Sequence, residues 1–298
     1  MNAMSLPTEL HDYGYVLVNV FAPSHFAGNP LAVFPHADGL SDADMQAIAI
    51  QMNLAETVFA FKSEDAVARL RIFTPDYELP FAGHPVIGAA RVLDQLKRLP
   101  AEFTVQTEAG ITQLKRDKMR YTFTRTQGEC DEVASSEVPA LLMALGLDDL
   151  SVSSAPCWVN TGSEQLLLEV SQTEVLSHIK PDAEQLSAWF AKQGKRAAVY
   201  LWHEKNRYVR VRFFSAVGNV LTEDIGTGSA CANLGGWCLA HGLNDVNWLI
   251  QQGDYLRRPN RLHLQTSAEG LIYVGGETIV VGHGSLSVPH SVKEHEPC

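Results

Sequence analysis

The chain has 298 residues and carries 34 acidic and 23 basic side chains, which give it a formal net charge of −11. Apolar residues make up 46% of the chain and charged residues 19%, so it can bury a sizeable core and is not expected to be disordered. Because no run of Lys or Arg offsets the acidic balance, binding to the phosphate backbone of a nucleic acid is not expected.

Short strands dominate the predicted elements. Eight runs are rich in β-branched and aromatic residues, a composition that favours strands. They cover residues 15–21, 57–61, 68–73, 121–123, 166–170, 199–202, 208–214 and 271–274. Since hairpin-length loops join the strands, a largely antiparallel sheet system is expected.

Four segments predict helices: residues 42–52, 85–96, 181–194 and 229–241. Ser41 and Asp44 have the spacing of a capping box at the start of the first helix. Gly194 ends the third helix, and the second and fourth each begin just after a glycine. Strands with a few long helices among them predict an α+β fold.

The two halves of the chain repeat a pattern. The first half has the run RIFT at 71–74 and then Gly83-His84, and the second has RFFS at 212–215 and then Gly228-Ser229. Each copy reads strand, loop, glycine, polar residue and helix, and the two glycines are 145 residues apart. A repeat of this length indicates a duplicated domain rather than a solenoid.

The boundary between the two copies is predicted in the polar, glycine-containing stretch 124–138. We therefore expect an N-terminal lobe over residues 1–126 and a C-terminal lobe over 127–282. A C-terminal strand near 283–298 is expected to return to the first lobe.

The cysteines indicate a reducing compartment. An odd number of them without a CxxC motif predicts neither a disulfide framework nor a zinc knuckle: Cys130, Cys157, Cys231, Cys238 and Cys298. A cytoplasmic protein is therefore expected. The first ten residues lack the pattern of a signal peptide, and no run of eighteen apolar residues predicts a membrane span.

The two glycine-led helix starts are candidate anion sites. The first N–H groups of a helix are unpaired and carry a partial positive charge, and a glycine lets an anion approach them closely. Each of Gly83 and Gly228, taken singly, is better explained as part of a plain cap. Their repetition at matching places favours a site that holds a small carboxylate-bearing molecule between the two helix ends.

Named cofactor motifs are missing from the sequence. The run Gly226-Thr227-Gly228 lacks the third glycine of a dinucleotide fingerprint, no GxxxxGK[ST] occurs, and Ser229 does not lie in a GxSxG elbow. The histidines at 84, 203, 241, 263 and 283 do not have metal-ligand spacing. Neither a metal nor an organic cofactor is expected.

Candidate acid/base groups lie beside the glycines and at the start of one strand. Glu56 precedes an apolar strand, where burial would raise its pKa and suit it to shuttle protons, although a carboxylate that points into solvent explains the position as well. His84 either caps its helix or binds substrate, and Asp224 is either a solvated loop charge or a substrate ligand. Asn29, which follows Gly28 and precedes Pro30, is explained by turn chemistry.

Five motifs in this order resemble the PhzF-like family of phenazine biosynthesis. They are FAGNPLAVF at 26–34, NLAET at 53–57, FTP followed by ELPFAGHP within 73–85, EDIGTGSA at 223–230, and QG followed by RP within 252–259. The resemblance covers about residues 15–280. It implies the fold of diaminopimelate epimerase, with two similar lobes, each a curled mixed sheet around a central helix, and an active site in the cleft between them. It also implies a homodimer that uses neither a metal nor an organic cofactor.

The resemblance further implies an activity. The best-known reaction of the family is the isomerisation of trans-2,3-dihydro-3-hydroxyanthranilate, in which a proton moves from one ring carbon to another. Matched to the family motifs, Glu56 is the catalytic proton shuttle. The substrate-binding set would comprise three side chains and two backbone N–H groups: His84, Asp224, Ser229, Gly83 and Gly228.

Two departures bear on this expectation. Epimerases of the fold use one cysteine before each glycine turn, and here Ala82 and Ile225 are assigned to these places, so two-cysteine racemisation is not expected. The family usually has Pro and Ala or Val where this chain has Ile225-Gly226, and this change is expected to loosen the turn that presents Asp224. The substrate can therefore differ from that of the phenazine enzyme.

Three hypotheses follow. The first is a cofactor-independent isomerase that uses Glu56 to move a proton on a small carboxylate. The second is a small-molecule-binding protein that kept the cleft without catalysis. The third is a serine hydrolase that uses Ser229 with His84 and Asp224.

Overall fold

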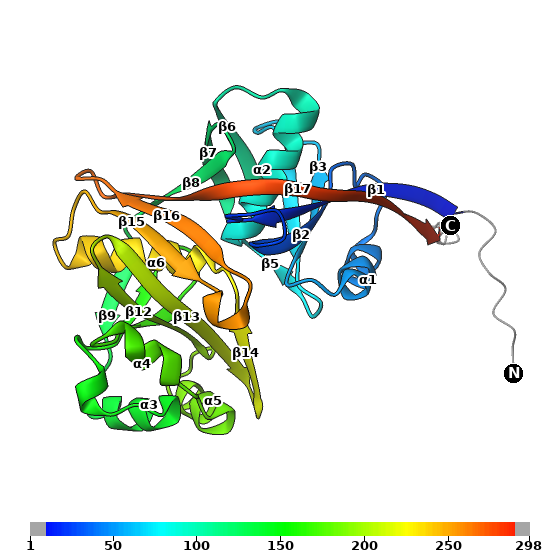
Figure 1. Cartoon of the computed structure of the whole chain (residues 1–298). Helices are drawn as coiled ribbons and strands as arrows, with labels where there is room; N and C mark the ends of the chain where they lie inside the picture. The colour runs from blue at the N-terminus through cyan, green and yellow to red at the C-terminus, as the bar shows by residue number, and fades with distance from the viewer. Residues whose placement is uncertain (1–9, 290–298) are drawn as a thin grey trace, which may run out of the picture.

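The computed structural model describes residues 10–289 (Figure 1). Its helices are α1 (Asp42–Met52), α2 (Gly83–Lys97), α3 (Val138–Leu145), α4 (Thr173–His178), α5 (Ala183–Lys192) and α6 (Gly228–Ala240). Its first nine strands are β1 (Leu10–Val20), β2 (Asn29–Phe34), β3 (Thr57–Phe61), β4 (Arg69–Phe73), β5 (Glu78–Leu79), β6 (Glu102–Thr107), β7 (Gly110–Asp117), β8 (Arg120–Thr126) and β9 (Glu129–Glu132). The remaining strands are β10 (Cys157–Asn160), β11 (Gln165–Glu169), β12 (Ala198–Lys205), β13 (Tyr208–Val217), β14 (Val220–Asp224), β15 (Asn247–Gln252), β16 (Asn260–Thr266) and β17 (Leu271–Pro289).

The two halves have the same connectivity. In the first half, β3 is parallel to β2 and antiparallel to β4, and β4 pairs with β5 and, in parallel, with β6. In the second half, β12 is parallel to β11 and antiparallel to β13, and β13 pairs with β14 and, in parallel, with β15. The helix α2 follows β5 as α6 follows β14. The predicted α+β fold of two similar lobes is confirmed.

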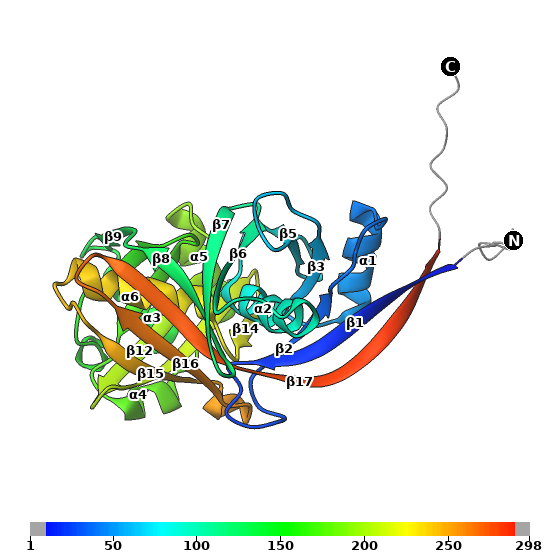
Figure 2. The ribbon, with the colours of Figure 1, turned by 90° about the horizontal axis from the view of Figure 1, so that it is seen from above.

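Each half curls around one central helix. In Figure 2 the strands of the first half surround α2, which packs on β1, β2, β8 and β17. The helix α6 packs in the same way on β9, β10, β16 and β17. Both helices are buried around most of their circumference, which is the pattern of a core helix rather than of an amphipathic surface helix.

The strand β17 connects the two halves. Its first residues pair with β16 and β8, and its later residues pair with β1 from Thr278 to Pro289 (Figure 1). The strand predicted over residues 271–274 is therefore the start of a much longer one. Residues 290–298 of the predicted returning strand, and Cys298, lie outside the described residues.

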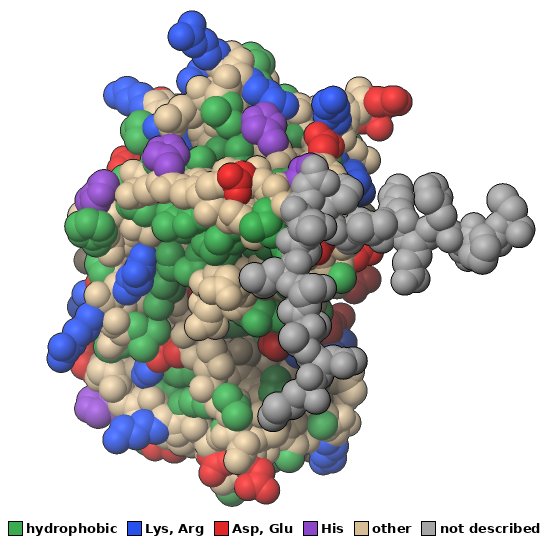
Figure 3. Space-filling model, turned by 90° about the vertical axis from the view of Figure 1, so that its right-hand side faces the viewer, with side chains coloured by type: hydrophobic (Ala, Val, Ile, Leu, Met, Phe, Trp, Pro, Cys, Tyr) green, Lys and Arg blue, Asp and Glu red, His purple; other side chains and the backbone are tan. Residues whose placement is uncertain are grey.

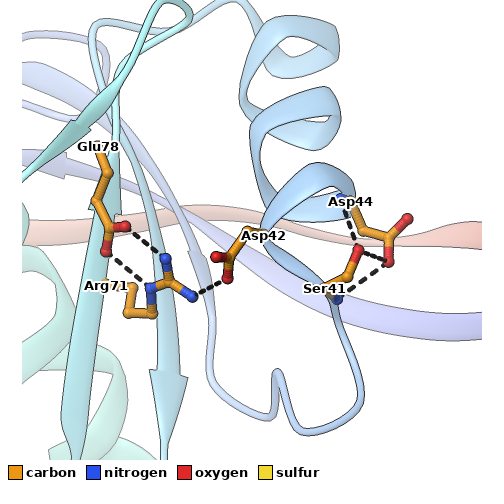
Figure 4. A network of polar contacts seen from close by, with 5 residues as sticks. All are labelled: Ser41, Asp42, Asp44, Arg71 and Glu78. Atoms are coloured by element: carbon orange, nitrogen blue, oxygen red, sulfur yellow. Dashed lines mark hydrogen bonds and ion pairs between the residues drawn. The ribbon is translucent and has the colours of Figure 1, made fainter.

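An ion pair of the same kind fixes the short strand before each central helix. Arg71 on β4 binds Glu78 on β5 through two hydrogen bonds and also reaches Asp42 at the start of α1 (Figure 4). The predicted capping box of α1 is seen beside it, in the contacts between Ser41 and Asp44 (Figure 4). In the second half, Arg212 on β13 binds Glu223 on β14 at 2.9 and 2.7 Å.

The surface shows scattered charges. On the face seen in Figure 3, basic side chains lie apart from one another and do not form a continuous basic patch. None of the helices formed by residues 10–289 has both the length and the apolar character that a membrane crossing requires.

Candidate active site

The N-termini of α2 and α6 meet at the junction of the two halves. A Cβ atom added to Gly83 would lie 3.1 Å from the Cα of Gly228, and one added to Gly228 would lie 3.3 Å from the Cα of Gly83. Only residues without a side chain allow this approach. The unpaired N–H groups of both first turns, and the partial positive charge of both helices, are thereby brought to one place, which favours an anion.

The close approach predicts the effect of a single methyl group. Gly83→Ala should cost about 1–3 kcal/mol of stability, because the new Cβ would also lie 3.0 Å from the ring of Phe123. We expect turnover to fall at least tenfold, since the two helix ends must separate. Thermal unfolding and kinetic assays test this. Gly282→Ala is the control, because its Cβ would have neighbours only at 3.9 Å, and wild-type turnover in Gly83→Ala would contradict the prediction.

Glu56 and His84 face each other beside this junction. Glu56 directly precedes β3, with its side chain 17% exposed, and His84 is buried in the first turn of α2. The distance from Oε2 of Glu56 to Nε2 of His84 is 3.4 Å. Both atoms are buried, and neither has a hydrogen-bond partner. Because buried polar atoms are normally paired, two such atoms side by side indicate a place where a ligand binds.

Burial changes the protonation of both groups. It raises the pKa of Glu56 to about 8, and repulsion from the Asp224 carboxylate adds to this effect. Burial also lowers the pKa of His84 to about 3, so its imidazole is neutral at pH 7. The pKa of Asp224 is likewise raised by burial, against the hydrogen bonds that it accepts. A carboxyl group with a pKa near the working pH is suited to both give and take a proton.

Asn29 links the Asp224 turn to His84. Its Nδ2 donates to the backbone oxygen of Gly226 at 3.0 Å and to Oδ1 of Asp224 at 3.3 Å, which orients the amide. The same Nδ2 lies 3.5 Å from Nδ1 of His84. Because this amide nitrogen cannot accept, a proton on Nδ1 would face a donor, and the contact favours the tautomer whose ring proton is on Nε2, toward Glu56. Turn chemistry alone had been sufficient to explain Asn29 in the sequence, and its place within the 26–34 motif was the signal of a larger role.

The turn that presents Asp224 is densely hydrogen-bonded. The carboxylate accepts hydrogen bonds from Oγ1 of Thr227 at 2.6 Å and from the backbone N of Gly226 at 3.3 Å. Gln252 binds the backbone oxygen of Asp224 as well as Thr227. A Cβ on Gly226 would lie 2.6 Å from Oδ1 of Asn260, so glycine permits close packing there. These contacts hold the turn in place and argue against the loosening expected from Ile225-Gly226.

Ser229 lies in the first turn of α6, next to Gly228. Its Oγ accepts a hydrogen bond of 3.0 Å from Nε2 of Gln165, while Nδ1 of His84 faces Asn29. Ser229 and His84 therefore lie at the same junction. Among the described residues, however, they do not form the hydrogen-bonded triad that a serine hydrolase needs. Gln165 gave no signal in the sequence.

Comparison with known proteins identifies the family. The profile of the phenazine biosynthesis-like proteins, PhzC-PhzF, matches residues 18–284. The chain belongs to this family. An uncharacterized isomerase of Pasteurella multocida, PM1503, is 48% identical over 293 residues, which cover 97% of this chain and 98% of the relative.

A second relative and a solved structure are also similar to this PhzC-PhzF chain. The trans-2,3-dihydro-3-hydroxyanthranilate isomerase of Pseudomonas chlororaphis is 31% identical over 91% of this chain and 98% of its own. The crystal structure of a PhzF-family phenazine biosynthesis protein from Bacillus anthracis has a TM-score of 0.81 at 22% identity, covering 93% of this chain and 99% of that one. This likeness confirms the two-lobed fold expected from the resemblance.

One residue assignment needs correction within the PhzC-PhzF fold. Ala82 is the N-cap of α2, and its counterpart at the N-cap of α6 is Thr227, whereas Ile225 lies two residues earlier. The sequence had been aligned on Gly226, but the helix starts at Gly228. Neither N-cap residue is a cysteine, and Cys231 is fully buried farther along α6, where burial raises the pKa of its thiol.

Glu56 has no carboxylate counterpart in the second half. Phe73 pairs with Thr57 and Glu78, as Phe214 pairs with Val199 and Glu223, so the residue that matches Glu56 is Ala198. Among residues 10–289 no group of three or more His, Cys, Asp or Glu side chains is placed to hold a metal ion. The Glu56 carboxyl at the junction is thus not duplicated in the second half.

Proposed function

We propose that the chain is a cofactor-independent isomerase that moves a proton on a small carboxylate-bearing, amino-acid-like substrate, with Glu56 as the general acid and base. One observation carries this proposal. A buried carboxyl whose pKa is raised to about 8 faces an unpartnered Nε2 of His84, at the point where two helix N-termini meet. Proton transfer is the chemistry for which such a pKa is suited.

The reaction follows from these positions. The substrate carboxylate binds at the N–H groups of the first turns of α2 and α6, beside Gly83 and Gly228. The Glu56 carboxylate removes a proton from one carbon and, as the carboxylic acid, returns it to another, so that no proton is gained or lost overall. The Nε2–H of His84 donates to an oxygen or nitrogen on which negative charge develops. Asp224 is held in place to accept a hydrogen bond from the substrate.

The first substrate to test is trans-2,3-dihydro-3-hydroxyanthranilate, on which the named relatives act. Incubation in D2O, followed by NMR, should show its conversion to an isomer, and the deuterium content of the product reports whether the proton on Glu56 exchanges with solvent. Thermal stabilisation by small carboxylates without proton movement on any of them would favour the binding-protein hypothesis instead.

The hydrolase hypothesis has its own test. Because the Oγ of Ser229 accepts from Gln165 and is not activated by a histidine, a fluorophosphonate probe should leave Ser229 unlabelled. Mass spectrometry of the treated protein measures this. Stoichiometric labelling of Ser229 would revive the hydrolase at the expense of the isomerase.

The assembly and location of the protein are also proposals. A homodimer is expected from the family resemblance, and light scattering of the purified protein tests it. A cytoplasmic location is expected from the cysteine usage of the chain.

A further inference from the structure

A chain of buried amide side chains leads from a loop of the second half to Ser229. The backbone N and Oγ1 of Thr161 donate to Oδ1 of Asn233 at 2.9 and 2.7 Å. Nδ2 of Asn233 donates to the backbone oxygen of Ser163 and to Oε1 of Gln165, both at 2.8 Å. Nε2 of Gln165 then donates to Oγ of Ser229 at 3.0 Å. Asn233 and Gln165 are 0% and 2% exposed, so water does not compete for these bonds.

The backbone groups of Thr161 and Ser163 set the direction of every hydrogen bond in this series of side chains. The backbone N–H of Thr161 can only donate, and the backbone oxygen of Ser163 can only accept. If the Asn233 amide were flipped, its NH2 group would face the N–H of Thr161 and its oxygen would face the oxygen of Ser163. Each contact would then leave a buried polar group without a hydrogen bond, which destabilises the fold. Asn233 therefore offers an N–H to Gln165, and Gln165 must turn its oxygen to Asn233 and its nitrogen to Ser229.

The consequence falls on the hydroxyl of Ser229. A serine hydroxyl has one proton to donate, and its oxygen here already accepts a hydrogen bond from Gln165. Its proton must then point away from Gln165. Ser229 lies in the first turn of α6, and the unpaired backbone N–H groups of such a turn cannot accept that proton.

We propose that Gln165, oriented by Asn233, is a positioning residue that makes the Ser229 hydroxyl a donor to an acceptor oxygen of the substrate. Because the Ser229 hydroxyl donates, the part of the site beside α6 favours a carboxylate of the substrate and disfavours an ammonium group. This inference rests on the proposed function in one respect, which is that the substrate binds at the junction of α2 and α6.

A double-mutant cycle on binding tests the proposal. The probe is 3-hydroxyanthranilate, the aromatic counterpart of the relatives' substrate, and calorimetry gives its Kd for the wild type, Gln165→Met, Ser229→Ala and the double variant. Gln165→Met should weaken binding about tenfold, because Ser229 is no longer held as a donor. In the Ser229→Ala background the same change should have no further effect, because Gln165 acts only through Ser229. Additive losses, or an unchanged Kd in Gln165→Met, would overturn the proposal.

Leu167→Met is the matched control, because Leu167 is two residues along the same strand and equally buried, but has no polar contact to Ser229. Its Kd for the probe should equal that of the wild type. A tenfold loss in this variant would show that any change in β11 disturbs the junction and would remove the support for Gln165.

A second measurement needs neither turnover nor a bound probe. In NMR spectra of the free protein, the side-chain amide protons of Gln165 should exchange slowly with solvent and shift in Ser229→Ala. Fast exchange, or a resonance indifferent to Ser229→Ala, contradicts the proposal whatever the substrate is. Failure of the proposed function is seen separately, as the absence of proton movement in D2O or of any binding of the probe to the wild type.

Discussion

The Glu56→Gln variant is expected to lose turnover by about 10²–10⁴-fold, because an amide cannot take a proton from carbon and return it. The two side chains have nearly the same shape, so binding of 3-hydroxyanthranilate should persist. The variant should unfold at a temperature equal to or above that of the wild type at pH 7. Because the pKa of Glu56 is raised in the folded protein, its protonation stabilises the folded state fully below pH 4.5, the ordinary pKa of a glutamate. This stabilisation is lost as the pH rises to about 8. Glutamine does not ionise, so the variant does not lose stability in this way as the pH rises to 7.

Glu169→Gln is the matched control for this variant. Glu169 on β11 is also half-buried, and burial raises its pKa as well, but it does not contact the junction of α2 and α6. Its replacement should leave kcat and KM within about twofold of the wild type. Wild-type turnover in Glu56→Gln, with activity lost in Glu169→Gln, would require a different catalytic group.

The pH dependence of kcat/KM should follow the ionisation of Glu56. Only the carboxylate can remove a proton from substrate, so kcat/KM should rise about tenfold per pH unit between about pH 6 and 7 and level off above about 8. His84 should add no inflection between about pH 5 and 9, because burial lowers its pKa to about 3.

The Asp224→Asn variant distinguishes the effect of burial on the pKa of Glu56 from the effect of the Asp224 charge. The negative charge of Asp224 adds to the effect of burial on Glu56, so its removal should move the inflection to lower pH, whatever it does to the maximal rate. Steady-state kinetics across the range gives both values. A wild-type profile that is already flat at pH 5, or an inflection that moves upward in Asp224→Asn, would contradict the role of Glu56 as the titrating base.

The sequence predicted the architecture well where local chemistry decides it. The repeat around Gly83 and Gly228 predicted the duplicated topology, because strand, turn and helix start recur together. Strands such as β6 and β7 were missed because polar residues that are exposed or half-buried alternate with their apolar ones, so neither strand forms a continuous run of β-branched and aromatic residues. The length of β17 was missed because glycines interrupt it, and its pairing with β1 and β8 overrides their low preference for strands.

The site was only partly predictable for a different reason. Acid/base chemistry could be expected from residue type at Glu56, His84 and Asp224, and these residues lie within the family motifs. Asn29 and Gln165 have amide side chains whose roles exist only through partners, such as Asp224, which lies 195 residues from Asn29. The wrong placement of the second N-cap arose from two glycines close together, of which only Gly228 begins the helix.

The pairing of β1 with β17 also bears on how the chain is made. Leu10 lies opposite Pro289, and the same strand β17 completes the edge of β8 in the first half and of β16 in the second. Neither half can therefore complete its sheet until β17 has left the ribosome. Contacts this distant along the chain delay folding. Until the residues of β17 emerge, the edges of β8 and β1 that they cover stay open to pairing with other chains. The sheets of both halves are thus completed by a single strand that follows all the others in the described part of the chain.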